Sequence, residues 1–266
     1  MIKSVKAKKN LGQHFLRDEN IAEKIASTIS PDSLPAGHPQ NWDSMPILEV
    51  GPGMGVLTKY LMQTGRPLEC VELDTESVEF LARLYPDLKV REDDFLKLDL
   101  ADIFGAPFAL IGNYPYNISS QIFFKVLDYR ESVPVVAGML QKEVAERICS
   151  GPGSKVYGIL SVLLQMWYDC EYLFNVEPGV FMPPPKVTSG VLRLTRNSRT
   201  EAGCDERLFK RVVKTAFGQR RKTLRNSLAS LIPPGSPALD SPLMPLRPER
   251  LSVEDFITLT NLIAQQ

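Results

Sequence analysis

Short apolar runs recur at regular intervals through the first half of the chain, and helix-like segments fill most of the gaps between them. The runs cover residues 46–51, 68–73, 88–91, 108–112 and 133–140, and each ends in a loop rich in Gly, Asp, Asn or Pro. In two gaps, 56–61 and 78–85, apolar residues follow the 3.6-residue spacing of an amphipathic helix. Alternating strands and helices predict βαβ units and a largely parallel sheet. The expected fold class is therefore α/β.

Two later strand candidates, 172–177 and 190–195, have no long helix between them. We expect them to form an antiparallel hairpin at the edge of the sheet.

The last part of the chain has a helical pattern. Apolar residues within 208–216 outline an amphipathic basic helix, and 251–263 predict a terminal helix. Ser252 and Asp255 resemble a capping box at the start of that helix, with Asp in place of the usual Glu. We therefore expect a large sheet domain at 1–198 and a small α-helical domain at 199–266.

Composition argues against several classes of protein. The chain is 44% hydrophobic and 23% charged, the balance of a soluble globular protein, and no apolar run reaches the roughly eighteen residues of a membrane span. The basic N-terminus lacks the apolar segment of a secretory signal. The four cysteines are far apart, and two histidines provide no metal-ligand spacing. We expect a cytoplasmic, metal-free protein with reduced thiols.

Charge is unevenly distributed, although the formal net charge is zero. The first nine residues contain four lysines and no acid. Residues 207–225 also contain no acid, and their basic side chains are Arg207, Lys210, Arg211, Lys214, Arg220, Arg221, Lys222 and Arg225. Such clusters favour phosphate binding, and a solvated helix face is the alternative interpretation.

The first predicted strand runs into a turn that contains Gly51, Gly53 and Gly55. Glycine lets a backbone adopt positive φ and approach a ligand closely. The G-x-G-x-G spacing differs from the G-x-G-x-x-G of nicotinamide-binding folds, so an oxidoreductase is a distant alternative. A Walker A loop is excluded because no Lys-Ser/Thr pair follows. S-adenosylmethionine is the remaining common ligand of such a turn.

Two acids end the next two predicted strands. Glu72 follows Gly51 by about twenty residues, the spacing at which a carboxylate accepts hydrogen bonds from ribose hydroxyls. Asp94 ends the third strand and precedes an apolar pair, so it is a candidate acceptor for an adenine amino group. The alternatives are a surface acid and a solvated acidic loop. The glycine turn favours the ligand-binding interpretation.

The fourth strand end reads Asn113-Tyr114-Pro115-Tyr116 and is the most specific motif in the chain. Methylating an exocyclic amine requires its lone pair to leave the ring plane. The Asn113 side-chain oxygen can accept one N–H, and a carbonyl held by the rigid proline can accept the other. Tyr116 offers a ring on which a base can stack. An ordinary Asn-Pro turn is the alternative.

At this point the chain resembles the small-subunit ribosomal RNA adenine dimethyltransferases. Residues 10–16 resemble the family's N-terminal element, with His14 where Asn is usual and with Leu16 matching. Residues 181–187 resemble its aromatic and proline loop, and 217–228 its C-terminal signature. Tyr114 stands where Leu is common.

The resemblance implies a Rossmann-like S-adenosylmethionine-dependent methyltransferase sheet. It implies cofactor contacts from His14, Leu16, Gly51, Gly53, Glu72, Asp94 and Asn113, and a catalytic site of Asn113, Pro115, Tyr116 and Phe181. Phe181 would form a second wall around the adenine, facing Tyr116. The C-terminal signature favours ribosome-assembly enzymes over resistance enzymes that modify large-subunit RNA.

The implied reaction is dimethylation of N6 on two adjacent adenosines in the 3′-terminal hairpin loop of 16S rRNA during small-subunit biogenesis. Arg220, Arg221, Lys222 and Arg225, together with the N-terminal lysines, would contact phosphates. We expect a monomer that acts on immature small subunits. Large-subunit rRNA or DNA as substrate, and a catalytically idle assembly factor on the same fold, remain alternatives.

Overall fold

The computed structural model describes residues 5–31 and 42–265, which divide into two compact units. The first unit runs to Ala145 and adds Asp169–Arg196. The second comprises Glu146–Tyr168 and the chain from Asn197 onward. Residues 146–168 thus cluster with the C-terminal part, whereas the sequence pattern placed them in the first domain. The functional division at 198/199 stays a prediction.

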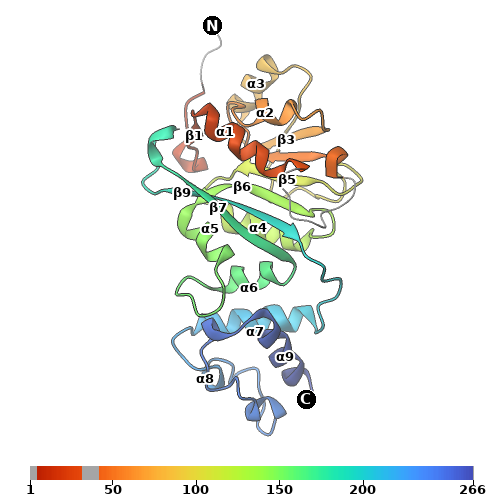
Figure 1. The fold of residues 1–266 in the computed structure, drawn as a ribbon, viewed down its shortest axis with the longest axis vertical. Helices are drawn as coiled ribbons and strands as arrows, with labels where there is room; N and C mark the ends of the chain where they lie inside the picture. Colours follow the sequence, from red (N-terminus) through yellow and green to blue (C-terminus); the bar gives the residue numbers. More distant parts are fainter. Residues whose placement is uncertain (1–4, 32–41, 266) are drawn as a thin grey trace. The chain divides into compact units, whose positions relative to one another are not determined.

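Within the described residues, seven strands form one sheet in the order β4-β3-β2-β5-β6-β9-β7 (Figure 1). They are β2 (Ile47–Val50), β3 (Leu68–Glu72), β4 (Lys89–Glu92), β5 (Ala109–Asn113), β6 (Val135–Gln141), β7 (Tyr168–Val176) and β9 (Ser189–Arg196). Strands β2 to β6 pair in parallel, and β9 runs antiparallel to β6. The predicted strands and the pairing of the last two candidates at one edge are confirmed.

The strand order places a topological switch point between β2 and β5. From β2 the chain builds outward through β3 and β4, then returns to the other side of β2 to build β5 and β6. Ligands of open α/β sheets bind beyond the carboxyl ends of the strands at such a point. The glycine turn follows β2 and the Asn113 motif ends β5, so the topology brings both to this crevice.

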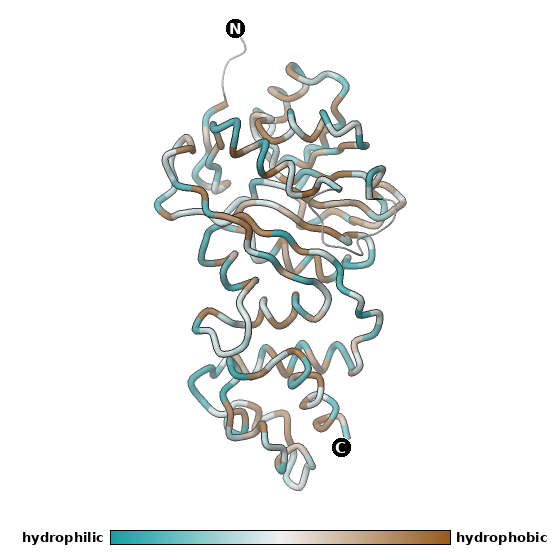
Figure 2. The backbone as a smooth tube through the Cα atoms, viewed as in Figure 1, coloured by the Kyte–Doolittle hydropathy of each residue, from teal (hydrophilic) through white to brown (hydrophobic). Residues whose placement is uncertain are grey.

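Helices of the first unit flank this sheet. They are α1 (Glu19–Ala26), α2 (Thr58–Met62), α3 (Thr75–Leu84), α4 (Ser119–Asp128) and α5 (Lys142–Cys149), the last of which spans the division between the units. The strands β2, β3, β5 and β6 are almost wholly buried, as expected for parallel strands covered on both faces. Figure 2 shows the sheet as predominantly apolar, while teal and brown alternate along the helices.

A second, two-stranded sheet joins the N-terminal segment to a distant loop. Strand β1 (Phe15–Leu16) pairs antiparallel with β8 (Phe181–Met182), and Leu16 lies opposite Phe181. Both of these side chains belong to the apolar core cluster of the first unit. The predicted N-terminal element and the predicted aromatic loop are thus one structural feature.

Tyr114 fits beneath the β5 loop because two neighbouring strands carry glycine. Its ring is fully buried, and its hydroxyl donates a 2.8 Å hydrogen bond to the Ala137 carbonyl oxygen. Gly112 and Gly138 are register partners, and a Cβ on Gly138 would lie 2.7 Å from the Tyr114 ring. The absence of both side chains makes room for a ring where the family usually has Leu.

The second unit is helical. Its helices are α6 (Ile159–Gln165), α7 (Glu206–Gly218), α8 (Leu224–Ser227) and α9 (Val253–Ala264). Helix α7 buries Phe209, whose ring meets Phe256 of α9 edge-on at 6.5 Å. The Ser252–Asp255 capping box at the start of α9 is present, as predicted.

Two predicted segments fall partly outside the described residues. Of the loop expected at 31–45, residues 32–41 are outside, and 42–44 form a short 3-10 helix with buried Trp42. Lys3 of the basic N-terminus is also outside.

Candidate active site

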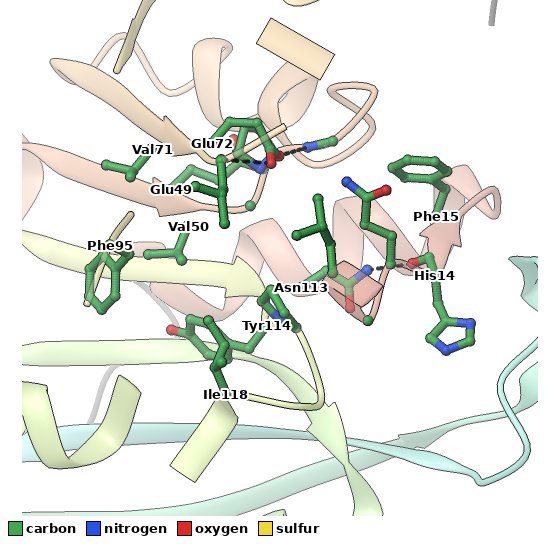
Figure 3. Close-up of a pocket in the computed structure, with 18 of the residues that line it drawn as sticks. His14, Phe15, Glu49, Val50, Val71, Glu72, Phe95, Asn113, Tyr114 and Ile118 are labelled. Carbon is green, nitrogen blue, oxygen red and sulfur yellow. Dashed lines mark hydrogen bonds between the residues drawn. The ribbon is translucent and has the colours of Figure 1, made fainter. Parts of the chain in front are cut away.

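One cavity in the first unit lies at the carboxyl ends of β2, β3, β4 and β5, and the N-terminal segment 11–16 forms another wall (Figure 3). Its lining includes His14, Leu16, Gly51, Gly53, Glu72, Asp94, Asn113, Pro115 and Tyr116. The topology therefore brings together all but one of the cofactor-binding and catalytic residues predicted from the sequence.

The glycine turn needs its glycines. Gly51, Gly53 and Gly55 have φ values of 68°, 54° and 79°, a left-handed region that L side chains rarely adopt. A Cβ on Gly53 would also lie 2.8 Å from the Phe15 ring. With no side chain there, the Gly53 amide donates a 3.0 Å hydrogen bond to the Glu72 carboxylate. The turn and the acid are thus one preorganised unit.

The Glu72 carboxylate is buried and held by the backbone. Besides the bond from Gly53, it accepts hydrogen bonds from the amides of Leu73 (2.9 Å) and Asp74 (3.0 Å). Burial raises the pKa of Glu72, and these backbone donors oppose that rise. A carboxylate has about four lone-pair sites, so three bonds leave one acceptor position on the oxygen that Gly53 contacts.

Glu49 is a functional candidate that the sequence analysis left unassigned. It lies in β2, is 1% exposed, and lines the cavity just before the glycine turn. Its carboxylate accepts hydrogen bonds from the Thr58 hydroxyl (2.7 Å) and the Cys70 thiol (3.5 Å). Burial raises the pKa of Glu49 to about 7. The available signal was an acid inside an otherwise apolar strand run.

Asp94 lines the cavity from the loop after β4. Its Oδ1 accepts a 3.0 Å hydrogen bond from the Leu96 amide, and its Oδ2 lies 3.4 Å from the Lys97 ammonium. Phe95, which follows it, is 4% exposed and also lines the cavity. A carboxylate and an apolar ring at one end of a cavity form a suitable environment for a purine.

Asn113 ends β5 with its side chain at the cavity. Its Nδ2 donates a 2.9 Å hydrogen bond to the His14 carbonyl oxygen, shown as a dashed line in Figure 3. This bond fixes the orientation of the amide, so Oδ1 is the atom left to accept a hydrogen bond from a ligand. In the next turn, the Pro115 carbonyl accepts from the Ile118 amide at 3.2 Å.

Tyr116 lies beside His14 at the same end of the cavity. Their ring centroids are 5.4 Å apart with a 32° tilt between the planes. The Tyr116 hydroxyl is hydrogen-bonded to the Ser189 hydroxyl at 2.5 Å, and burial raises its pKa. His14 Nδ1 lies 2.8 Å from the Pro183 carbonyl oxygen. Because a carbonyl only accepts, Nδ1 is the protonated nitrogen.

Phe181 does not lie where the resemblance implied. It is 3% exposed, packs into the core cluster with Leu16, and is absent from the cavity lining. The physical reason is the β1–β8 pairing: successive residues of a strand point to opposite faces, so Phe181 points inward and Met182 is 52% exposed. The ring that the structure places next to Tyr116 is that of His14.

The N-terminal segment is fastened over the edge of the cavity. The Lys8 ammonium pairs with Asp74 and with Glu76, the latter at 3.2 Å. Gln13 donates to the Asp74 carboxylate at 3.3 Å and accepts from the Lys8 amide at 2.8 Å. Lys8 therefore serves an internal contact, and this differs from the phosphate contact expected of the N-terminal lysines.

The four predicted RNA-binding side chains of the second unit fall into two classes. Arg220 donates to the Ser154 carbonyl at 3.3 Å, and Arg225 donates to the Leu239 carbonyl at 2.7 Å. Arg221 and Lys222 are exposed and have no hydrogen-bond or ion-pair partner within residues 5–31 and 42–265. Two of the cations thus hold the fold, and two face solvent.

Two further findings concern the described part of the chain. No helix there is long and apolar enough to cross a membrane. No group of three or more His, Cys, Asp or Glu side chains in that part could hold a metal ion.

Comparisons with known proteins agree with this site. A protein of Parabacteroides distasonis named ribosomal RNA small subunit methyltransferase A is 59% identical, over 98% of this chain and 95% of that protein. A protein of the same name from Cytophaga hutchinsonii is 52% identical over 99% of both chains.

Solved structures show the same fold. A dimethyladenosine transferase from Plasmodium falciparum has a TM-score of 0.75 at 24% identity, covering 92% of this chain and 96% of that one. The 23S rRNA methyltransferase ErmE has a TM-score of 0.66 at 26% identity, covering 94% and 100%. The Rossmann-like methyltransferase fold expected from the sequence is confirmed. Since the model of the ribosomal RNA adenine dimethylase family matches residues 4–265, the chain belongs to that family.

Proposed function

We propose that this protein uses S-adenosylmethionine to dimethylate N6 of two adjacent adenosines in the 3′-terminal hairpin loop of 16S rRNA. The observation that carries the proposal is the Asn113 amide, whose nitrogen is tied to the His14 carbonyl and whose oxygen is left for a ligand. The relatives named small subunit methyltransferase A support the choice of the small subunit. We propose a monomer that acts in the cytoplasm on immature small subunits.

The cavity fits the proposed cofactor by the chemistry of its donors and acceptors. Its glycine turn has no room for a Cβ at Gly53, so only backbone faces the ligand there. The one unused acceptor position of Glu72 suits a ribose hydroxyl, and Asp94 with Phe95 suits an adenine. When bound, S-adenosylmethionine supplies a methyl group on a sulfonium centre that is ready for direct transfer.

The chain's own groups orient the target amine. Asn113 Oδ1 accepts one N6–H, and the carbonyl of the Tyr114–Pro115 amide accepts the other, which draws the nitrogen lone pair out of the base plane. Pro115 keeps that carbonyl rigid, and the buried Tyr114 ring anchors it to β6 through Ala137. No strong base is required, because positioning supplies most of the effect.

The second methyl transfer uses fewer contacts. After the first transfer only one N6–H remains, so one of the two acceptors is sufficient to orient the amine. Tyr116 provides the stacking surface in both rounds, and His14 takes the place beside it that the resemblance gave to Phe181. A base in a hairpin loop reaches such a pocket at low unstacking cost.

The second unit supplies phosphate contacts in this proposal. Arg221 and Lys222 are exposed and uncommitted, which suits side chains that meet a phosphodiester backbone. Arg220 and Arg225 contribute indirectly, because they fix the backbone on either side of these two residues.

A substrate comparison tests the proposal. Methyl-labelled S-adenosylmethionine is incubated with small-subunit particles lacking the methyl groups, with naked 23S rRNA, and with DNA. We expect label in the small-subunit RNA alone. Label in 23S rRNA alone would instead favour the activity of the structural neighbour ErmE. Binding of particles without methyl transfer would favour the idle assembly factor.

A further inference from the structure

Lys125 makes an unusual set of contacts for a helical lysine. It lies on α4, and its ammonium donates to the carbonyl oxygens of Leu96, at 3.1 Å, and Leu98. It also lies 5.8 Å from the Phe95 ring centroid and 5.2 Å from that of Tyr129. Among the described residues no carboxylate lies within ion-pair distance of it. Its partners are backbone carbonyls and ring faces.

This placement has a cost that needs a compensating role. Desolvation lowers the pKa of Lys125, and the more distant acids Asp99, Asp94 and Asp128 offset part of that effect. A lysine needed only for its apolar stem would extend its ammonium to solvent. Here the ammonium turns inward and satisfies two carbonyls of a loop that has no helix or strand of its own.

The loop that Lys125 holds forms the adenine end of the cavity. Asp94, Phe95 and Leu96 all line it. The Leu96 peptide is fixed on both sides, because its amide donates to Asp94 Oδ1 at 3.0 Å and its carbonyl accepts from Lys125. Moving the Leu96 peptide would therefore move the Asp94 carboxylate.

From this geometry we infer that Lys125 is a positioning residue that sets the cofactor's base specificity. It holds the 94–98 loop so that Asp94 meets the 6-amino group of adenine and Phe95 packs beside the ring. The inference rests on the proposed function, since it assumes an adenosyl cofactor in this cavity. It adds a residue that touches neither the cofactor nor the RNA.

Two ligands that differ at one position test the inference. S-adenosylhomocysteine carries the 6-amino group, and S-inosylhomocysteine carries a carbonyl oxygen in its place. Titration calorimetry on the full-length protein gives the ratio of the two dissociation constants. We expect the wild type to prefer the adenosyl ligand about tenfold or more, because the inosyl ligand would leave Asp94 facing an acceptor.

The variant Lys125→Met keeps the stem and removes the donors. We expect its ratio to fall at least about fivefold, mainly through weaker adenosyl binding, since one well-placed hydrogen bond is at stake. Lys125→Arg keeps the charge and donors and should preserve most of the ratio. Lys89→Met is the matched control, because Lys89 pairs with Glu69 outside the cavity.

The outcomes separate the inference from the function on which it rests. A folded Lys125→Met protein with the wild-type ratio overturns the inference and leaves the proposed function standing. A wild type that binds neither ligand overturns both. If Lys125→Met does not fold, Lys125→Gln replaces it: one donor group remains for two carbonyls, and an unchanged ratio again overturns the inference.

Discussion

The cavity of the first unit and the basic surface of the second use polar side chains in opposite ways. In the cavity, Glu72 and Asn113 are each tied to the backbone, and each retains an acceptor atom for a ligand. In the second unit, the tied side chains Arg220 and Arg225 use their donors on carbonyl oxygens, and the untied Arg221 and Lys222 face solvent.

The difference reflects the two tasks. Transfer to an exocyclic amine depends on direction, so the groups that contact it must be held in one orientation. Phosphate binding depends mainly on charge, and mobile side chains meet that need. Tethering therefore identifies the catalytic groups in one unit, and its absence identifies the phosphate-binding groups in the other.

The largest expected effect follows from removing the tethered amide. Asn113→Ala should lower the rate of methyl transfer by about 10²–10³-fold, as loss of one preorganised polar group typically does. Cofactor affinity should change only slightly, because Glu72 and the glycine turn remain. Single-turnover rates and calorimetry measure the two effects, with the exposed Asn226→Ala as control. A rate within tenfold of wild type would break the comparison.

The next effect is a pH dependence that resides in the cavity. Burial raises the pKa of Glu49 from 4.5 to about 7, so the folded state favours the neutral acid. As pH rises from 4.5 to about 7, the unfolded chain ionises first and stability falls; above that range both states are ionised and the loss is complete.

At about 1.4 kcal/mol per pKa unit, this loss amounts to about 3 kcal/mol. Urea unfolding of wild type and Glu49→Gln at several pH values measures it, with the exposed Glu79→Gln as control. The difference in unfolding free energy between wild type and Glu49→Gln should shift across this range. A constant difference would contradict the assignment.

The untethered cations should control the salt dependence of RNA binding. The double substitution Arg221→Ala and Lys222→Ala should reduce the slope of log affinity against log salt by about one per lost phosphate contact. The substrate is the small-subunit hairpin RNA, and binding is measured across a salt series. An unchanged slope would show that these side chains do not meet phosphates.

The smallest effect concerns a tethered cation. Arg225→Ala removes the hydrogen bond to the Leu239 carbonyl and should lower the free energy of unfolding by about 1 kcal/mol, because the side chain is exposed. Its salt slope should stay near that of wild type. Urea denaturation and the same binding series test this, and a slope reduced as in the double variant would remove the distinction between the two classes.

Much of the site could be predicted because chain topology fixes it. Strand ends of a parallel sheet converge on one edge, so Gly51, Glu72, Asp94 and Asn113 had to lie near one another once the strand–helix alternation was recognised. The spacing of residues along the chain carries that information directly.

What the sequence did not reveal depends on side-chain direction. Phe181 lies on a two-residue strand, too short for an alternating pattern to indicate its inward face. Arg220 and Arg225 look like their neighbours in sequence, and only tertiary contacts show that they hold carbonyls. Glu49 was hidden because an acid in an apolar run was grouped with its strand.

The most direct test of the central claim is the identity of the product on its natural position. Small-subunit particles that lack the methyl groups are incubated with methyl-labelled S-adenosylmethionine and the wild type or Asn113→Ala protein, and the RNA is digested to nucleosides. The account predicts label as N6,N6-dimethyladenosine at the two adjacent adenosines of the 3′-terminal hairpin, and almost none with Asn113→Ala. Label on another base, or equal label with both proteins, would contradict it.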